Sequence, residues 1–411
     1  MTERNQPRPP PRYPLSCSTW GEAEIAAIHR VIASGRYTMG SEVMAFEAEF
    51  AAHFGSRHAV MVNSGSSANL LAIAGLRYHP DQPLRPGSEI LVPAVSWSTT
   101  FFPVHHLGFR LRFVDVDRDT LNLDLDGLEA AMSPETGAVL AVHLLGNPVD
   151  FDRLRGLCGR HDLVLIEDSC ESMGAMQGDR HTGTVGRCGT FSTFYSHHIS
   201  TMEGGVLVTD DEALFHTALA LRAHGWVREQ PASSHLQITG DEFERSFRFV
   251  LPGFNLRPLE MSGAIGRAQL KKLPSFLQAR RRNAEFYRQF CGDIDGIRLQ
   301  RETGKSAWFG FSFLLEGPLS GKRASLVKRF AAEGIECRPI VAGNFLNNPV
   351  IAHLNHRVAR PLEVSDAIDR DGLFIGNHHL DLEADLRRVG SVLKDFALRE
   401  KNSAAVTFDA S

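Results

Sequence analysis

The chain has 411 residues, of which 43% are hydrophobic, and its formal net charge at pH 7 is −4. This length allows a large buried core and predicts two domains rather than one. The weak negative charge and the scattered basic residues give no reason to expect a nucleic-acid-binding protein. No segment approaches the roughly 18 apolar residues of a membrane span, and the beginning of the chain has no apolar signal core.

The six cysteines argue against a metal centre. No two of them are closer than twelve residues, and no C-x-x-C pair occurs, so a metal or iron–sulfur site is not expected. Adjacent histidines occur three times, but neighbouring side chains in a strand point to opposite faces and make no natural chelate. We expect a reduced, cytoplasmic protein that binds no metal, membrane or nucleic acid.

The predicted elements alternate along the chain. Residues 1–12 are rich in proline and predict a flexible arm, and residues 401–411 predict a flexible tail. Amphipathic stretches such as 43–54 and 212–222 predict helices. Short apolar runs predict strands at 59–62, 89–92, 111–116, 138–145, 163–166, 191–195 and 206–209. The alternation favours an α/β fold in which helices cover both faces of a mostly parallel sheet.

A different pattern begins after residue 255. A long helical stretch at 258–291 is followed by a predicted strand at 308–315, a helix at 322–333 and a strand at 335–340. We therefore expect a large domain at 13–255 and a smaller α+β domain at 256–400.

Polar residues follow the first predicted strand and precede a helical run. They form the stretch NSGSSAN at 63–69, which includes Gly65 and Ser66. Hydroxyls and free N–H groups at a helix N-terminus converge on an anion, so this stretch predicts a phosphate-binding cradle. The alternative is a turn that only caps the helix.

Two further strand ends carry candidate ligands for a flat heterocycle. Trp97 follows the strand at 89–92 and could stack on such a ring, although a lone tryptophan also fits a core. Asp168 ends a buried run at the edge where doubly wound folds bind ligands. It could pair with a protonated pyridine nitrogen, or it could be only a capping residue. Glu171 could orient a cofactor or a catalytic histidine.

The stretch TFSTFYSHHISTMEGG at 190–205 reads like a pyridoxal-phosphate (PLP) motif in which histidine replaces the lysine. A lysine amine normally binds this cofactor covalently, and the first lysine of the chain is Lys271. An imidazole has no primary amine, but its ordinary pKa of about 6.5 lets it shuttle a proton near neutral pH. His197 is the candidate acid and base.

Across nearly all of 13–395, the chain resembles the sugar-nucleotide aminotransferase family and, within it, the histidine-bearing 3-dehydratase branch. In this family the catalytic lysine stands seven residues after the threonine of Thr-Phe-Ser, and here that place is held by His197. The resemblance implies a fold-type I PLP-dependent (aspartate aminotransferase-like) fold. Besides 190–205, it rests on PAVSWSTT at 93–100, PGFNLRPLEMSGAIG at 252–266, GIECRPI at 334–340 and GNFL at 343–346.

The resemblance also implies roles for individual residues. Trp97 would stack on the cofactor ring, Asp168 would meet its nitrogen, and His197 would be the catalytic acid and base. The cofactor phosphate would lie at Gly65, Ser66 and Ser192, joined by Asn255 from a neighbouring subunit. The working unit would therefore be a homodimer with shared active sites. Further expected residues are Glu171 at the cofactor and, more weakly, Ser196, His224 and Arg228 at the substrate.

The implied cofactor is PLP or its amine form, pyridoxamine phosphate (PMP), held without a covalent bond, with L-glutamate as the amino donor. The implied reaction removes the C3 hydroxyl of GDP-4-keto-6-deoxy-D-mannose and gives GDP-4-keto-3,6-dideoxy-D-mannose, in the biosynthesis of colitose-type dideoxysugars and O-antigen. His197 would take up a proton at the cofactor and deliver it to the departing oxygen, with a pKa near neutrality. No reductase partner is expected.

Several alternatives stay open at this point. A CDP-4-keto-6-deoxyhexose 3-dehydrase would need an iron–sulfur cluster, which the cysteine spacing opposes. A sugar-nucleotide 4-aminotransferase would need a lysine, which the chain lacks before Lys271. An inactive binding protein with this fold would leave Asp168, Trp97 and the cradle without a purpose. GDP rests on the resemblance alone, and only the spacing from Thr190 selects His197 over His198.

Overall fold

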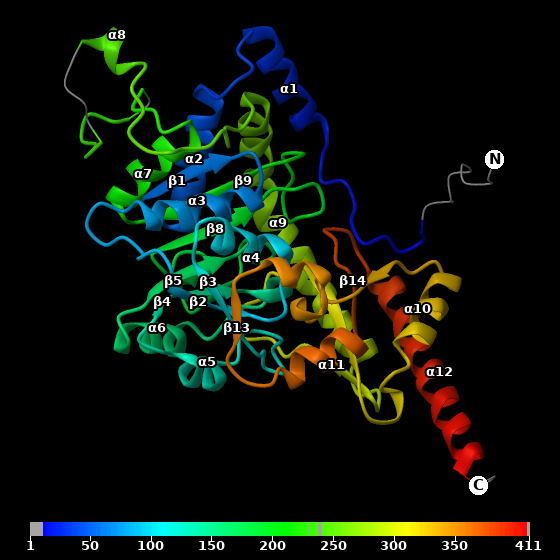
Figure 1. Ribbon diagram of the computed structural model, residues 1–411. Helices are drawn as coiled ribbons and strands as arrows, with labels where there is room; N and C mark the ends of the chain where they lie inside the picture. The colour runs from blue at the N-terminus through cyan, green and yellow to red at the C-terminus, as the bar shows by residue number, and fades with distance from the viewer. Residues whose placement is uncertain (1–10, 229, 237–240, 409–411) are drawn as a thin grey trace, which may run out of the picture.

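The computed structural model describes residues 11–228, 230–236 and 241–408. A large sheet of eight strands forms the centre of the molecule (Figure 1). All of its neighbouring pairs are parallel except the two that involve β9. In spatial order, the strands are β1 (His58–Val62), β9 (Gly205–Thr209), β8 (Cys188–Ser192), β5 (Val164–Asp168), β4 (Thr136–Val142), β2 (Glu89–Pro93), β3 (Arg110–Val114) and β13 (His356–Val358).

Helices cover both faces of this sheet because alternate strand residues are apolar on both sides. On β1, Val60 and Val62 pack in the core under α3 (Gly65–Arg77), α4 (Ser98–His106) and α7 (Glu212–Arg222). Ala59 and Met61 point to the other face and pack with α2 (Ser41–Phe54) and α9 (Glu260–Cys291). The same opposite face is covered further along by α5 (Leu125–Ala131) and α6 (Phe151–Arg160). The predicted α/β fold with a mostly parallel sheet is confirmed.

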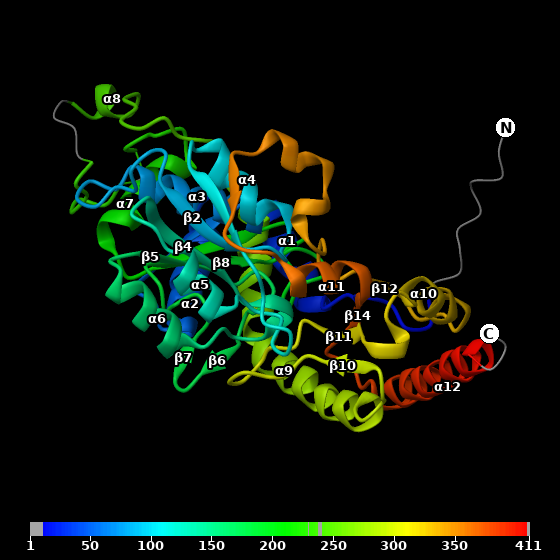
Figure 2. The same ribbon diagram turned by 60° about the horizontal axis from the view of Figure 1, so that its bottom comes forward.

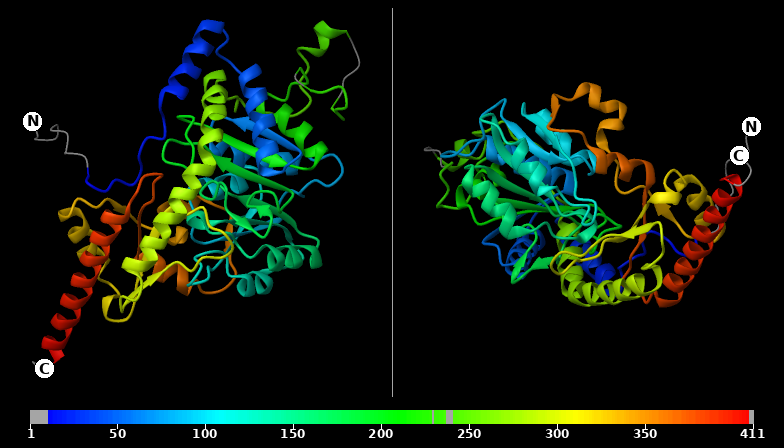
Figure 3. Two further views of the ribbon diagram at one scale, coloured as in Figure 1. Left: turned by 180° about the vertical axis from the view of Figure 1, so that it is seen from behind. Right: turned by 90° about the horizontal axis from the view of Figure 1, so that it is seen from below.

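The second body is built on a four-stranded antiparallel sheet with its own core. The long helix α9 runs from the back of the large sheet into this body, as Figure 3 shows from behind. Tyr13 is buried in the same core and donates from its hydroxyl to the Gly376 carbonyl at 2.6 Å. The elements are β10 (Ile297–Leu299), β11 (Gly310–Leu315), β14 (Gly372–Gly376), β12 (Cys337–Arg338), α10 (Arg323–Ala332), α11 (Glu363–Asp371) and α12 (Glu383–Phe408).

The remaining elements lie at the periphery. α1 (Glu22–Ser34) packs on α9, and α8 (Glu242–Arg245) sits on an arm that projects beside α7 (Figure 1). The strands β6 (Met176–Gln177) and β7 (Arg180–His181) form a small hairpin. No helix within the described ranges is long and apolar enough to cross a membrane.

The division into two bodies does not follow the expected domain boundaries at 13–255 and 256–400, because segments of each expected domain pack in the other body. The segment at 343–362 returns to the large sheet, where β13 pairs in parallel with β3 (Figure 2). Tyr13, at the other end of the chain, belongs to the core of the smaller body. Helix α12 continues to Phe408, so much of the expected tail at 401–411 is helical. Most of the expected arm at 1–12 lies outside the described residues.

Candidate active site

All strands of the large sheet except β9 end at the same edge. Because β1 and β8 both pair antiparallel with β9, they run in the same direction as β5, β4 and β2. Asp168 is the last residue of β5, and Ser192 is the last residue of β8. Helices α3 and α4 begin just beyond the ends of β1 and β2. The polar residues that follow separate strands in the sequence are thereby gathered at this carboxyl edge.

The first turn of α3 forms a cradle of N–H groups against β8. Ser64 caps the helix, and its Oγ accepts a hydrogen bond from the Ser67 N–H at 3.1 Å. The N–H groups of Gly65 and Ser66 belong to the first turn and have no acceptor within the helix. A methyl group on Gly65 would lie 2.6 Å from Ser192 Cβ and 3.0 Å from Cys170 Sγ, so glycine is required for this close approach. The turn therefore caps the helix and still offers free donors beside the Ser192 hydroxyl.

Asp168 is buried, and its orientation is fixed by three neighbouring elements. Its Oδ2 accepts hydrogen bonds from Asn69 Nδ2 of α3 and from Thr100 Oγ1 of α4, both at 2.8 Å. Its Oδ1 accepts from the Cys170 N–H at 3.2 Å. Asn69 is held in turn by the Thr190 hydroxyl of β8 at 2.6 Å. These contacts tie the carboxylate to the cradle on one side and to the helix that follows Trp97 on the other.

Two further candidates are connected to Asp168 through neighbouring residues. Trp97 precedes α4, whose Thr100 binds Asp168, and Glu171 follows Asp168 in the sequence. Trp97 directly precedes α4, is 57% exposed, and makes no ring contact within the described part of the chain. Its indole therefore offers an open face for stacking. Glu171 Oε2 accepts from the Leu145 N–H at 2.9 Å. Burial raises the pKa of Glu171 to about 7, and the nearby Asp168 charge raises it further against the effect of the Leu145 N–H.

The adjacent histidines have different surroundings. Strand β8 ends at Ser192, earlier than the predicted strand at 191–195, and both histidines lie in the following turn. His198 is fully buried, and its Nε2 lies 3.1 Å from the Ala307 carbonyl oxygen. His197 is only partly buried and packs edge-on against the Phe309 ring at a centroid distance of 5.1 Å. The structure thus leaves His197, rather than His198, able to reach a ligand.

The pKa of His197 differs from the expectation of a near-neutral value. Burial, together with the positive charge of Arg280, lowers this pKa to about 4, and His197 Nδ1 is buried without a hydrogen-bond partner. The imidazole is therefore neutral at pH 7 and able to accept a proton. Once protonated, it is a stronger acid than an ordinary histidine and passes the proton on more readily.

Three expected residues lie apart from this group. His224, Arg228 and Asn255 belong to the arm that carries α8, and within the described residues none of them forms a hydrogen bond or ring contact with Asp168 or His197. Arg228 instead stacks over the Trp226 ring, 4.7 Å from its centroid, and is exposed. The expected Ser196 directly precedes His197 in the turn.

Sequence reasoning missed the residues that hold the site in place. Asn69 was within the predicted cradle but had no role there, although a buried amide beside a strand-end carboxylate is a natural orienting group. Phe309 and Arg280 come from the smaller body, more than eighty residues after His197, and no local signal marks them. No group of three metal-ligating side chains occurs in the part of the chain that the structure describes.

Comparisons with known proteins agree on one family. The profile of the DegT/DnrJ/EryC1/StrS aminotransferase family matches residues 18–394. The GDP-4-keto-6-deoxy-D-mannose 3-dehydratase of Yersinia pseudotuberculosis is 50% identical over 385 residues, which are 93% of this chain and 98% of that protein. A solved GDP-4-keto-6-deoxymannose-3-dehydratase with a trapped PLP-glutamate geminal diamine has a TM-score of 0.91 and 48% identity, covering 93% of this chain and 100% of that one.

A solved variant of such a dehydratase is also similar. In it, one histidine is changed to lysine and the serine before it to asparagine. It has a TM-score of 0.90 and 48% identity to this chain, and the match covers 92% of this chain and 100% of the variant.

Proposed function

The chain belongs to the DegT/DnrJ/EryC1/StrS aminotransferase family, and we propose that it is a PLP-dependent sugar-nucleotide 3-dehydratase of deoxysugar biosynthesis. Its substrate is GDP-4-keto-6-deoxy-D-mannose, its amino donor is L-glutamate, and its product is GDP-4-keto-3,6-dideoxy-D-mannose. The observation that carries this proposal is the group formed by Gly65, Asp168 and Ser192 at one edge of the sheet, with the partly exposed His197, and no lysine, in the turn that follows β8.

The donor set at the carboxyl edge fits PLP. The free N–H groups of Gly65 and Ser66, with the Ser192 hydroxyl, would hold its phosphate. The buried Asp168 carboxylate, kept in place by Asn69 and Thr100, would hold the ring nitrogen in its protonated state. The open indole face of Trp97 would cover the ring. When bound, the cofactor supplies an electron sink for breaking a bond next to an attached carbon.

His197 is the group that moves protons. It is neutral at pH 7, so it could accept the proton released when the C–H bond next to the electron sink breaks, and then donate that proton to the departing C3 hydroxyl, which would leave as water. The low pKa favours the second step, because the proton is held weakly. The similar solved variant supports His197 over His198, since the altered histidine there follows a serine. His197 follows Ser196 in this chain, whereas His198 follows a histidine.

The aminotransferase alternative lacks its lysine in the structure as well as in the sequence. Lys271 is exposed on α9, and its neighbour Lys272 pairs with Glu24 at 2.7 Å. Lys305 is exposed in the loop that pairs with Met176. The other lysines lie on or next to α10 and α12, away from the carboxyl edge. A covalently held cofactor therefore has no partner here, and dehydration is the chemistry that remains.

The proposed working unit is a homodimer. Asn255 is exposed, and it ends a segment that carries the exposed aromatic side chains of Phe243, Phe247 and Phe249. A second subunit would cover these rings and receive Asn255 at its phosphate cradle. Mixing a His197→Asn chain with an Asn255→Leu chain should then restore about one quarter of the sites, because each mixed dimer regains one intact site. No restored activity from a mixture shown to exchange subunits would refute sharing.

The main experiment is incubation of the protein with PLP, L-glutamate and GDP-4-keto-6-deoxymannose, followed by mass measurement of the sugar nucleotide. Loss of the C3 oxygen without gain of nitrogen supports the proposal, and gain of nitrogen would identify an aminotransferase. Borohydride treatment is the second readout. It should leave the cofactor free in the wild-type protein but attach it in a His197→Lys variant, which should lose dehydration.

A further inference from the structure

Arg280 is a buried cation without a carboxylate partner. It lies on α9, is 4% exposed, and forms no ion pair with any of the described acidic side chains. A charge removed from water in this way is costly unless polar groups replace the water. Burial lowers the pKa of Arg280 to about 10, so the guanidinium is still charged at neutral pH. A buried charge that is kept at this cost calls for an explanation.

Backbone carbonyls take the place of a carboxylate around Arg280. Its Nη1 donates to the Asn377 carbonyl at 2.8 Å and to the Trp308 and Phe309 carbonyls at 3.3 Å, while its Nε has no partner. Trp308 has a φ of 47°, in the left-handed region that non-glycine residues rarely adopt. Its strained backbone turns two successive carbonyls toward the same guanidinium.

The segment that Arg280 holds is the one that contacts the histidine pair. The Phe309 ring packs against the His197 ring, and the Ala307 carbonyl lies 3.1 Å from His198 Nε2. The Phe309 N–H donates to the Leu145 carbonyl at 2.9 Å, and the Leu145 N–H donates to Glu171. Contacts therefore lead without a break from α9 through 307–309 to the histidine pair on one side and to Glu171 on the other.

We infer that Arg280 is a positioning residue for His197. Its guanidinium holds the 307–309 segment against the imidazole and places a positive charge behind it, so that a proton taken up by His197 is passed on rather than kept. The positioning of His197 stands on these contacts, the effect of the charge also draws on the lowered pKa of His197, and the consequence for turnover rests on the proposed dehydration.

The other titratable groups around His197 do not replace Arg280 in this role. Burial lowers the pKa of His197 most, and among the described residues the charge that lowers it further is that of Arg280. His198 shares the turn but is itself held neutral by burial and by Arg280. Glu171, on the far side of Leu145, has a pKa raised to about 7 and is only partly charged at neutral pH.

The groups on the opposite side of Arg280 are neutral. His378 and His379 follow β14, and burial, with Arg280, lowers the pKa of both. Burial raises the pKa of the Cys17 thiol, which lies 3.7 Å from His379 Nδ1. No described group on this side neutralises the guanidinium, so its field reaches the histidines unopposed.

Arg281, the next residue of α9, provides a matched control. Its Nε and Nη2 donate to the Ser306 and Gly174 carbonyls, at 3.0 and 2.9 Å, so it also ties α9 to neighbouring backbone. Its charge acts on His198 and His181 but not on His197. Substitution of Arg281 therefore shows what the loss of any arginine from α9 does, and substitution of Arg280 shows what is specific to that residue.

The test is a histidine titration by NMR in the PLP-loaded protein labelled at histidine Cε1. The His197 signal is assigned by its loss in His197→Gln. We expect His197 to stay neutral to below about pH 5 in the wild-type protein, and its midpoint to rise by about one pH unit or more in Arg280→Met. Arg280→Lys, which keeps the charge, and Arg281→Met should leave the midpoint in place.

Three results would overturn the inference. They are a wild-type midpoint near an ordinary 6.5, an unchanged midpoint in folded Arg280→Met, and an equal shift in Arg281→Met. If Arg280→Met does not fold, Arg280→Gln, which retains a donor for the carbonyls, replaces it with the same expected shift. The acid limb of the kcat/KM profile should move with the NMR midpoint. A protein with the expected NMR shift but without dehydration would refute the proposed function and leave the role of Arg280 intact.

Discussion

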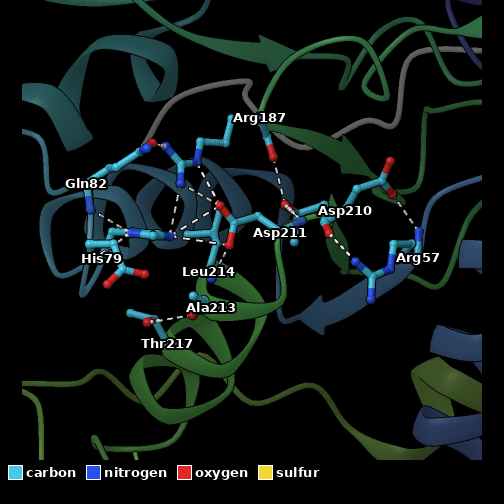
Figure 4. A network of polar contacts seen from close by, with 11 residues as sticks. Arg57, His79, Gln82, Arg187, Asp210, Asp211, Ala213, Leu214 and Thr217 are labelled. Carbon is cyan, nitrogen blue, oxygen red and sulfur yellow. Dashed lines mark hydrogen bonds and ion pairs between the residues drawn. The ribbon is translucent and has the colours of Figure 1, made fainter. Parts of the chain in front are cut away.

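The two edges of the large sheet carry the same kinds of polar side chain. At the amino edge these side chains bind one another, whereas at the carboxyl edge some of their hydrogen-bonding atoms are unused. At the amino edge, Arg187 donates from Nε and Nη2 to Asp211 Oδ2 at 2.8 and 2.6 Å, and His79 Nε2 lies 3.2 Å from the same oxygen (Figure 4). His79 Nδ1 accepts from the N–H groups of Asp81 and Gln82. The arginine, the histidine and the aspartate therefore satisfy one another.

At the carboxyl edge and beside it, the corresponding groups are left with unused capacity. Among the residues that the structure describes, His197 Nδ1 and Arg280 Nε have no hydrogen-bond partner, and the first-turn N–H groups of α3 have no acceptor within the helix. The difference shows where the fold is stabilised and where it is prepared for a ligand. Paired charges hold the amino edge together, whereas the carboxyl edge keeps donors and a neutral base available at a cost in stability.

The largest expected effect is on the rate of deoxygenation, and it distinguishes His197 from His79. His197→Asn should lower the rate of C3 deoxygenation by about 10² to 10⁴, because it removes the proton carrier. His79→Asn should keep the rate of deoxygenation and lower the free energy of unfolding by about 1 kcal/mol, because the buried imidazole and its hydrogen bonds to Asp211, Asp81 and Gln82 are lost. Product formation by mass spectrometry and urea unfolding measure the two quantities. The comparison fails if both variants lose activity equally.

The next effect concerns the cradle. Gly65→Ala should weaken PLP binding about 10- to 100-fold, since the new methyl group, 2.6 Å from Ser192 Cβ, must displace either Ser192 or the first turn of α3, which both carry proposed phosphate contacts. Gly159→Ala on α6, where a methyl group meets nothing within 4 Å, is the matched control and should bind normally. Absorbance titration with PLP gives both dissociation constants. Equal affinities would remove Gly65 from the phosphate site.

Glu171 should make the cofactor-free protein less stable as the pH rises. Its folded pKa of about 7 exceeds the ordinary value, so its contribution to stability is complete below about pH 4.3 and is lost as the pH rises through about 7. Glu171→Gln, which keeps an acceptor for the Leu145 N–H, should therefore gain stability over the wild type by about 1–3 kcal/mol between pH 5 and 8. Parallel unfolding curves across this range would contradict a raised pKa.

Asp211 should show the opposite and smaller trend. Burial alone would raise its pKa, but hydrogen bonds from the Leu214 N–H, Arg187 and His79 outweigh this and lower it to about 2. Its contribution to stability is present above about pH 3.9 and is lost as the pH falls toward 2. Asp211→Asn should remove about 1 kcal/mol of this acid-side dependence after solvent screening. Acid titration of both proteins by circular dichroism checks the sign.

Much of the fold could be predicted because it follows from local patterns. The apolar run at 206–209 and the amphipathic stretch at 212–222 became β9 and α7 with nearly the expected bounds. The strand at 191–195 was too long, because the apolar pattern continues through Phe194 and Tyr195 after the pairing with β9 stops at Ser192. The strand β13 was not predicted, since three residues with two exposed side chains carry no periodic signal.

The residue types of the candidate site could be predicted from the sequence, but the residues that surround and orient them could not. Asp168 and Ser192 end strands that share an edge, and this rule of parallel sheets needs no coordinates. The near-neutral pKa expected for His197 was wrong because it depends on burial and on Arg280, which no spacing in the sequence reveals. Likewise, the spacing from Thr190 pointed to His197, but it did not show that His198 is bound to the Ala307 carbonyl.

The sequence by itself determined the available chemistry. A histidine stands seven residues after Thr190, no lysine precedes Lys271, and polar residues follow several of the apolar strands. These facts depend on residue identity and local order, which a sequence states directly. The tertiary structure decided that His198 is buried against the Ala307 carbonyl while His197 stays partly exposed, that the pKa of His197 is lowered, and that the buried Arg280 holds the segment behind it. Burial and charge proximity depend on which distant segments meet, so these properties arise only when the chain is folded.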